Sequence, residues 1–321
     1  MILYFAAGLA TALLLTPVFR RFALRNSIVA RPNHRTVHQG EVAKLGGGAI
    51  FTAFLAGMIL FGVTNRSEFL ANTGALVSLT FGAMILFLLG ALDDKADLNC
   101  NLKLLIEIAA AALVVAYGWR VETLILPASI QLSLGVFSYP LSVLWIVGVT
   151  NSFNMIDGLD GLAAGIAVVV LICSLAIAAL FGNLLLLPII FVLLGATIGF
   201  LRYNLNPASI FMGDSGSLSL GFLLACISLS VATTNSGASA VLIPLLLLGL
   251  PLTDTSLAII RRGRRGIHPF HADREHIHHR LVGLGLTHSG AAAAMVGLSF
   301  ILGLMAYLVA HGIHMDLSLL K

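Results

Sequence analysis

Residues 161–181 read GLAAGIAVVVLICSLAIAALF, an apolar stretch without a charged side chain. A helix needs about 20 such residues to span the hydrocarbon core of a bilayer, so this stretch predicts a transmembrane helix. Nine further apolar stretches predict spans at about 1–19, 46–63, 74–92, 102–118, 139–151, 184–201, 216–233, 238–260 and 290–310. The stretch at 139–151 is long enough only if its helix continues through residues 151–156. The predicted fold is therefore an all-α polytopic membrane protein of about ten transmembrane helices.

The composition supports this class. Hydrophobic residues make up 59% of the 321 residues and charged residues only 10%, whereas soluble proteins carry about 25% charged residues. A water-soluble enzyme, a secreted disulfide scaffold and a disordered chain are excluded. Cys100, Cys173 and Cys226 are scattered, and the last two lie in apolar runs, where they are expected as small buried hydrophobic side chains. We treat residues 1–321 as a single domain.

The distribution of charge predicts an orientation. If the ten spans are sorted by side, all but Arg66, Arg120 and Lys321 of the 18 Lys and Arg residues fall on one side. The positive-inside rule assigns that side to the cytoplasm and places both termini outside. Seven aspartates and eight of the ten histidines fall on the same side, which favours an enzyme working at the cytoplasmic interface. Residues 119–138 predict a small extracytoplasmic hairpin.

The first polar cluster is Asp93-Asp94-Lys95-Ala96-Asp97. On a helix, Asp93 and Asp97 share a face, and Asp94 points about 100° away from them. Carboxylates at a membrane interface are costly, so they usually bind a cation or move a proton. A solvated loop that caps a helix is the simpler alternative, and the DDxxD pattern also fits prenyltransferases.

Two further clusters contain aspartates beside glycines. In NSFNMIDGLDG (151–161), Asn154, Asp157 and Asp160 recur every three residues and predict one polar stripe on a helix or 3₁₀ turn. Asp160 is also expected to cap the helix that follows. In FMGDSGS (211–217), Asp214 stands where a span begins. It either caps that helix or binds Mg²⁺, which prefers one or two carboxylates together with substrate phosphates.

The fourth cluster is HPFHADREHIHHRL (268–281). We expect a short helix beginning at residues 273–274, on which His276, His279 and Arg280 share a face and form a cradle for a diphosphate or a sugar. A zinc site is the rival interpretation, although no cysteine accompanies the histidines and the arginines would repel a dication. In the first basic loop, Lys44 precedes three glycines; it either fixes the topology or contacts a phosphate.

Together these clusters resemble the polyprenyl-phosphate N-acetylhexosamine-1-phosphate transferases. LDDKADL, NSFNMIDGLDGLAAG, FMGDSGSLSLG and HADREHIHHRL occur in that family's order, preceded by VHQGEVAKLGG, and the resemblance covers residues 20 to 290. The histidine-rich loop is similar to the WecA/TagO branch, which uses UDP-N-acetylglucosamine (UDP-GlcNAc). The related MraY branch, which takes the muramyl-pentapeptide donor, has a different histidine motif.

The resemblance implies a reaction. Undecaprenyl phosphate would attack the β-phosphorus of UDP-GlcNAc and give undecaprenyl-diphospho-GlcNAc and UMP. This step begins a lipid-linked cell-envelope glycan, such as a lipopolysaccharide O-antigen or a cell-wall polymer. The implied place is the bacterial cytoplasmic (inner) membrane, with the catalytic loops facing the cytoplasm. The implied partners are the two substrates and the bilayer, without nucleic acid, and a homodimer is left open.

By motif position, the resemblance also implies roles. Asp214 would be the principal ligand of Mg²⁺, with Mn²⁺ as an alternative ion. Asp94 would assist the metal or the phosphates, and Asp93 would accept a proton from the lipid phosphate. A phosphate with a second pKa near 6 hardly needs a base at pH 7, and a two-step scheme with an aspartate nucleophile stays open.

The substrate contacts are implied in the same way. Asn154, Asp157 and Asp160 would lie on the nucleoside side, and Phe211 would stack on uracil unless it only packs in the core. Lys103 is a candidate for the lipid phosphate, and His276, His279 and Arg280 for the sugar or diphosphate. One departure concerns the first loop, where many relatives have Pro-Arg before the glycines and this chain has Ala43-Lys44. A bidentate arginine contact is therefore not expected there.

Three other classes of protein were weighed. An intramembrane prenyltransferase would not explain HADREHIHHR. A CDP-alcohol phosphotransferase has an Asp-Gly pair followed by Ala-Arg, and that arginine is missing after Gly158. A transporter should place ionisable residues near the bilayer midplane, and Asp254 is the only candidate for such a residue. The muramyl-pentapeptide donor remains the alternative within the same chemistry.

Overall fold

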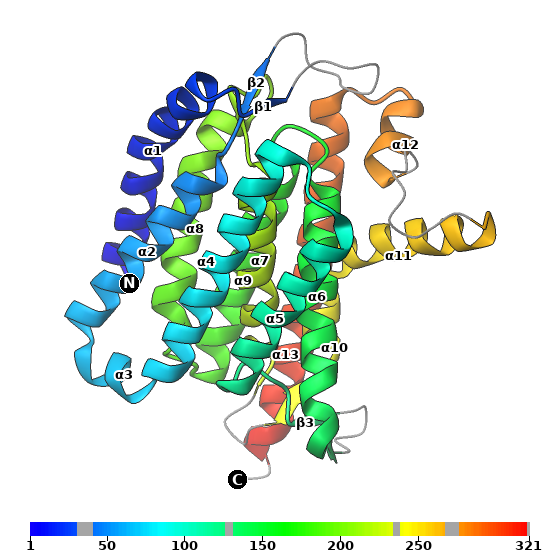
Figure 1. Cartoon of the computed structure of the whole chain (residues 1–321). Coiled ribbons are helices and arrows are strands. Elements are labelled where there is room, and N and C mark those ends of the chain that lie inside the picture. The colour runs from blue at the N-terminus through cyan, green and yellow to red at the C-terminus, as the bar shows by residue number, and fades with distance from the viewer. Residues whose placement is uncertain (31–40, 126–130, 234–237, 267–275, 320–321) are drawn as a thin grey trace.

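The computed structural model describes residues 1–30, 41–125, 131–233, 238–266 and 276–319. Figure 1 shows most of the helices packed side by side in one bundle. In the described residues, eight helices are long and apolar enough to cross a membrane. They are α1 (Ile2–Arg25), α2 (Gly47–Thr64), α4 (Thr73–Ala96), α6 (Ser138–Ile156), α7 (Leu162–Phe181), α8 (Leu186–Asn204), α9 (Gly213–Val231) and α13 (His288–Leu319). The predicted class, a polytopic helical membrane protein, is confirmed.

Shorter elements connect or flank these helices. They are α3 (Arg66–Ala71), α5 (Cys100–Ala116), the 3₁₀ turn η2 (Gly135–Phe137), α10 (Leu242–Leu247), α11 (Gly249–Arg264) and α12 (Ile277–Gly283). Helix α5 corresponds to the stretch predicted at 102–118; it has 17 residues and packs against α4 and α6. Helix α6 does continue to Ile156, so the short stretch at 139–151 belongs to a full-length helix.

The prediction of one continuous span over 238–260 is wrong. Strand β6 (Ala238–Ala240), α10 and α11 replace it, and the chain leaves the helical conformation at Leu248. Pro251 gives a physical reason, because a proline has no N–H to donate to the carbonyl four residues earlier and its ring would clash with that carbonyl. Figure 1 shows α11 projecting from the bundle at a steep angle. The count of ten spans, which included this stretch, is not confirmed, and the location of both termini on one side stays a prediction.

Helix α9 forms the centre of the bundle. It packs against α2, α4, α6 and α7. In its most apolar 18-residue stretch, 89% of the residues are buried. Its sequence, GDSGSLSLGFLLACISLSV, supplies many small residues that let neighbouring helices approach closely. Cys226 of α9 and Cys173 of α7 are buried free thiols, as predicted. Because α9 is enclosed on several sides, its first residue is held in a fixed position at the end of the bundle.

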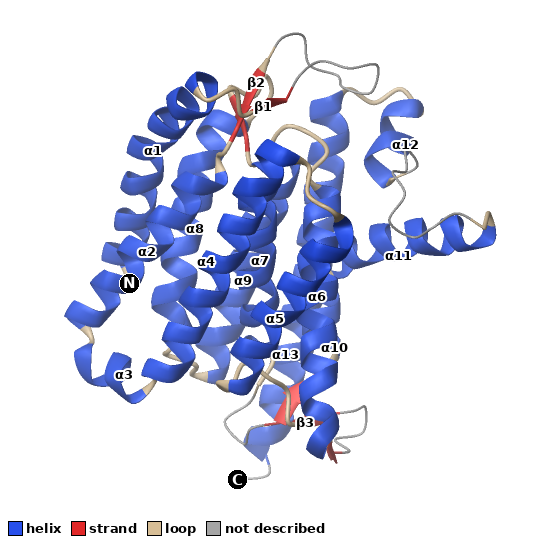
Figure 2. Ribbon diagram, viewed as in Figure 1, coloured by secondary structure: helices blue, strands red, loops and turns tan. Residues whose placement is uncertain are grey.

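Two small sheets lie at opposite ends of the bundle (Figure 2). One contains β1 (Val29–Ala30), β2 (Val42–Lys44) and β5 (Ile210–Phe211), with β1 antiparallel and β5 parallel to β2. We call the end of the bundle that holds this sheet the site end. At the other end, β3 (Thr123–Ile125) pairs with β4 (Gln131–Ser133) in antiparallel register and with β6 in parallel. The predicted hairpin in 119–138 is confirmed, and its extracytoplasmic location stays a prediction.

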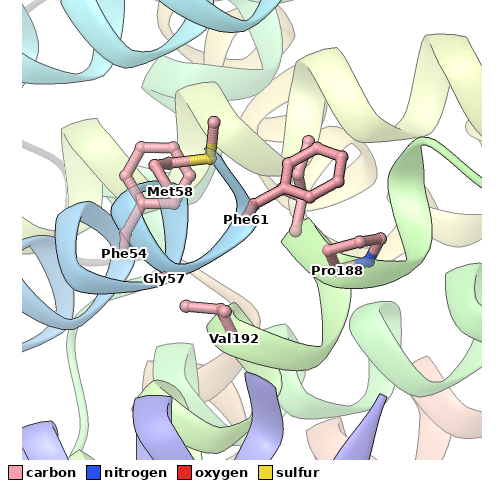
Figure 3. Close-up of a pocket in the computed structure, with 7 residues that line it drawn as sticks. Phe54, Gly57, Met58, Phe61, Pro188 and Val192 are labelled. Carbon is pink, nitrogen blue, oxygen red and sulfur yellow. The ribbon is translucent and has the colours of Figure 1, made fainter. Parts of the chain in front are cut away.

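Helices α2 and α8 meet along an apolar seam. Figure 3 shows Phe54, Met58 and Phe61 of α2 around a pocket that Pro188 and Val192 of α8 also line. The pocket has no room for a water molecule and no polar lining. It is a packing gap between helices, and the functional residues lie elsewhere.

Candidate functional site

The first turn of α9 carries Asp214 at the site end. The residue before it, Gly213, has φ +71°, and a Cβ there would lie 2.5 Å from Asp94 Oδ2. Only glycine fits a left-handed conformation that also touches a carboxylate. A Cβ on Gly90 of α4 would lie 2.2 Å from the carbonyl oxygen of Asp214. Helix α4 therefore contacts the backbone of α9 directly at Asp214.

Asp94 binds the beginning of α9. Its Oδ1 accepts the backbone N–H of Asp214 at 3.0 Å, and its Oδ2 accepts that of Ser215 at 3.1 Å. The first N–H groups of a helix lack partners within the helix and attract negative charge. Asp94 thus serves as an N-terminal cap supplied by a different helix. A role of Asp94 as a metal ligand stays a prediction.

Asp93, Lys103 and Asp214 form an ionic cluster. Lys103 Nζ of α5 lies 2.6 Å from Asp93 Oδ2 and 3.7 Å from Asp214 Oδ2. Asp93 Oδ1 also accepts the N–H of Leu98 at 2.7 Å, which fixes the chain after α4. The Asp93 side chain is 7% exposed and that of Asp214 is 33% exposed. Asp214 is therefore the carboxylate that a substrate can reach, and Asp93 anchors Lys103 behind it.

Asn154 joins the same cluster from α6. Its Nδ2 donates to Asp214 Oδ1 at 3.2 Å and to Ser217 Oγ at 2.7 Å. One turn earlier, Asn151 Nδ2 donates to the carboxylate of Glu107, which is buried on α5 one turn from Lys103. Glu107 belongs to no motif, and Ser217 lies in the FMGDSGS motif but was not among the predicted site residues. The packing of α5, α6 and α9 reveals both contacts.

The predicted polar stripe of residues 154, 157 and 160 is wrong. Helix α6 ends at Ile156, and Asp157 occupies its C-cap position. The expectation that Asp160 caps the next helix is also wrong, because Gly161, with φ +74°, takes that place. Asp160 Oδ2 instead accepts Asn206 Nδ2 at 3.0 Å and the Ala208 N–H at 2.9 Å. The short-range sequence pattern could not anticipate this pairing with the 205–209 loop.

Asp157 lies near the ionic cluster. Its pKa is raised to about 7, mainly by burial and also by the neighbouring carboxylates of Asp94 and Asp160, while Lys44 opposes the shift. Lys44 of β2 is paired in register with Phe211 of β5, so the first loop and the α9 motif are brought together. The structure thus places Lys44, Phe211 and Asp157 around the beginning of α9.

The histidine cluster is centred on the start of α12. The predicted helix start at 273–274 lies outside the described residues, and α12 begins at Ile277 with His276 as its N-cap. The rings of His276 and His278 stack at 5.7 Å, and that of His279 lies 4.1 Å from His278. His279 and Arg280 are exposed, whereas His276 and His278 are buried.

Asp254 of α11 closes this cluster. Its Oδ2 lies 2.8 Å from His276 Nδ1, and its Oδ1 accepts the Ile277 N–H at 2.8 Å. Burial alone would raise the pKa of Asp254, but the hydrogen bonds from His276 and Ile277 bring it below the usual range. The sequence singled out Asp254 only as the candidate residue of a transporter; its paired carboxylate gives that class no support.

His278 connects the histidine cluster to the Asp157 loop. A Cβ on Gly158 would lie 2.5 Å from His278 Nε2, so ring and loop are in direct contact. Burial lowers the pKa of His278 to about 4, helped by the neighbouring His279 and His276. His278 was not among the predicted site residues, because its spacing differs from that of the residues expected on one helix face.

The ionic cluster fits a magnesium ion. Asp93 and Asp214 are neighbouring carboxylates, and Lys103 Nζ, which contacts both, offsets only one of their two negative charges. A divalent cation beside Asp214 would offset the remaining charge. In the described part of the chain, no three His, Cys, Asp or Glu side chains gather as a ready-made metal cage. Mg²⁺ does not need one, since it is usually held by one or two carboxylates, waters and substrate phosphates.

Comparison with known proteins identifies the family. The family described as glycosyl transferase family 4 matches residues 76–232. A probable undecaprenyl-phosphate N-acetylglucosaminyl 1-phosphate transferase of Bacillus subtilis is 38% identical over 303 residues, which cover 94% of this chain and 83% of that protein. The chain therefore belongs to the polyprenyl-phosphate N-acetylhexosamine-1-phosphate transferases, a superfamily of enzymes.

Two further relatives have related names. A decaprenyl-phosphate N-acetylglucosaminephosphotransferase of Mycobacterium tuberculosis is 36% identical, with 89% of this chain and 74% of that protein covered. An undecaprenyl-phosphate alpha-N-acetylglucosaminyl 1-phosphate transferase of Escherichia coli is 29% identical, with 84% and 72% covered. The family resemblance of the sequence motifs is confirmed.

Proposed function

We propose that this protein transfers GlcNAc-1-phosphate from UDP-GlcNAc to undecaprenyl phosphate. The observation that carries the proposal is the meeting of Asp93, Lys103 and Asp214 at the first turn of α9. Phosphoryl transfer depends mainly on positioning and on neutralising charge, which this arrangement supplies. The names of the three relatives support the acceptor class and the sugar.

The chemistry is a displacement at phosphorus. An oxygen of the lipid phosphate forms a bond to the β-phosphorus of UDP-GlcNAc, the bond from that phosphorus to the bridging oxygen breaks, and UMP leaves with the electron pair. Lys103 Nζ, held by Asp93, would contact the incoming phosphate. Bound Mg²⁺, held by Asp214, would neutralise the diphosphate. Because the lipid phosphate is mostly doubly ionised at pH 7, Asp93 serves here to orient Lys103, and its role as a proton acceptor remains the alternative.

The remaining residues surround this centre. Phe211, Asp157 and Asp160 are assigned to the uridine side, Lys44 to a phosphate, and His276, His279 and Arg280 to the sugar or diphosphate. Asn154 holds Asp214 by its hydrogen bond, so we assign it to the carboxylate cluster. The positive-inside distribution of Lys and Arg supports a cytoplasmic location of the site end in a bacterial inner membrane.

The test is a transfer assay in detergent. Purified protein is incubated with radiolabelled UDP-GlcNAc, undecaprenyl phosphate and Mg²⁺, and butanol-extractable label and released UMP are measured. Both should appear with wild type and disappear with a chelator or with Asp214→Asn. Label from UDP-MurNAc-pentapeptide alone would assign the chain to the peptidoglycan reaction. Label from neither donor would overturn the proposal.

A further inference from the structure

A buried carboxylate on α11 is engaged entirely by the start of α12. Asp254 is 2% exposed, and each of its oxygens has one partner at 2.8 Å: the ring of His276 and the N–H of Ile277. Burying a carboxylate is costly unless it is paired and hydrogen-bonded. Two short hydrogen bonds to consecutive residues therefore indicate a contact that holds the start of α12 and the His276 ring in one arrangement.

The contact with Asp254 determines which nitrogen of His276 is available. An ionised carboxylate only accepts hydrogen bonds. Nδ1 of His276 must therefore carry a proton and donate the hydrogen bond to Asp254. Nε2 then remains for another partner. It accepts a hydrogen bond from a hydroxyl when the ring is neutral, and it donates one to an anion when the ring is charged.

The ring of His276 is also fixed from its other side. It stacks on His278 with an angle of 4° between the ring planes, and His278 packs against Gly158 beside Asp157. The ring is only 7% exposed, so little freedom of rotation remains. Helix α11, α12 and the Asp157 loop thus form a continuous set of contacts that orients one imidazole.

We propose that Asp254 is a positioning residue for the sugar-nucleotide donor, which acts by fixing the tautomer and the orientation of His276. The inference rests on the proposed function and extends it to a residue outside the motifs. The donor that His276 recognises offers sugar hydroxyls and a diphosphate, and both are partners for a correctly presented Nε2. The alternative is that Asp254 only caps α12 through the Ile277 N–H.

Asp254→Asn separates these two roles. The amide keeps an oxygen that accepts the Ile277 N–H, so the cap remains. Its NH₂ group faces His276 Nδ1 and donates to it, which forces the proton onto Nε2 and inverts the tautomer. Asp254→Ala removes both hydrogen bonds. The matched control is Thr255→Val, because Thr255 is the buried neighbour on α11 whose hydroxyl has no hydrogen-bond partner.

The experiment measures kcat, KM for UDP-GlcNAc and thermal unfolding for the full-length protein in detergent. We expect Asp254→Asn to unfold near the wild-type temperature and to lose at least about tenfold in kcat/KM, as other losses of a histidine's orienting carboxylate do. Thr255→Val should match wild type in both.

A double-mutant cycle completes the test. His276→Asn keeps a donor for Asp254 but has no atom at the Nε2 position, so adding Asp254→Asn to it should cost no further activity. Equal losses from Asp254→Asn in both backgrounds would overturn the inference. So would a wild-type kcat/KM in Asp254→Asn beside a destabilised Asp254→Ala, since that pattern assigns a capping role alone. A wild type inactive with both donors would overturn the proposed function and this inference with it.

Discussion

The carboxylate of Asp94 accepts the backbone N–H of Asp214 at 3.0 Å. Asp94 thus holds the first turn of α9, the helix that carries Asp214. A pair of adjacent aspartates at the end of α4 therefore has two separate tasks, because Asp93 binds Lys103 and Asp94 binds α9.

Asp94→Asn tests the capping task. The asparagine oxygen can accept one of the two N–H groups, and its NH₂ then faces the other. We expect a loss of about 1 kcal/mol in the free energy of unfolding, the usual cost of a lost cap, together with reduced transfer activity. Thermal unfolding and the transfer assay check this. Abolished activity at unchanged stability would instead indicate direct contact of Asp94 with the metal or the phosphates.

Lys103→Met tests the ionic cluster. Asp93 would be left buried without its cation, and breaking a buried pair in this way costs about 3 kcal/mol or more. We expect lower thermal stability and loss of transfer. Lys95→Met is the matched control, since Lys95 lies exposed at the end of α4. If both variants behaved like wild type, Lys103 would have no part in the site.

Gly90→Ala tests the contact of α4 with α9. The added methyl group would lie 2.2 Å from the Asp214 carbonyl oxygen, so the two helices must separate, at a cost of about 1–3 kcal/mol. We expect activity to fall at least tenfold, because Asp93 and Asp94 of α4 would shift relative to Asp214 of α9. In Gly62→Ala, by contrast, the methyl group would meet only Phe69 at 3.7 Å. This control should be neutral or slightly stabilised, and equal effects of the two variants would contradict the prediction.

Asp157 and His278 should affect stability with opposite pH dependence. The pKa of Asp157 is raised to about 7, so between about pH 4 and 7 the folded protein keeps a proton that the unfolded chain releases. Its contribution to stability is present at low pH and is lost as the pH rises through this window. The pKa of His278 is lowered to about 4, so on acidification this histidine gains a proton in the unfolded chain before it does in the folded protein. The contribution of His278 to stability is therefore lost as the pH falls from about 6.5 to 4.

Single variants should expose the two slopes. Asp157→Asn removes the loss of stability that Asp157 causes as the pH rises to 7, so the unfolding temperature of this variant should rise with pH relative to wild type. His278→Gln removes the loss of stability that His278 causes as the pH falls, so its unfolding temperature should rise relative to wild type as the pH is lowered. Thermal unfolding in detergent from pH 4.5 to 7.5 measures both. Parallel curves for wild type and either variant would show that the corresponding group keeps its ordinary pKa in the folded protein.

Hydrophobicity was enough to predict the class of fold and most of the helices. The length of α6 was left conditional on Asn151 to Ile156, and the structure meets that condition. The break between α10 and α11 was missed because average hydropathy does not register a single proline such as Pro251. The location of α11 outside the bundle follows from that break.

Motif spacing identified the main carboxylates but not their partners. Asn154 was assigned to the nucleoside because it shares a motif with Asp157, yet its amide contacts Asp214, 60 residues later. Glu107 lies in an apolar run and was not singled out, and Asp254 was noticed only as the candidate residue of a transporter. Their contacts depend on how α5, α6, α11 and α12 pack, which lies beyond the range of local sequence.

The close contact at Gly90 also sets how near two helices can come. With the backbone of α4 against that of α9, no room is left between them for a side chain. The far end of α12 is different, because nothing lies within 4 Å of a Cβ at Gly283 or Gly285. A side chain at either of these two glycines would meet no neighbour, whereas at Gly90 even a methyl group would press on the backbone that presents Asp214.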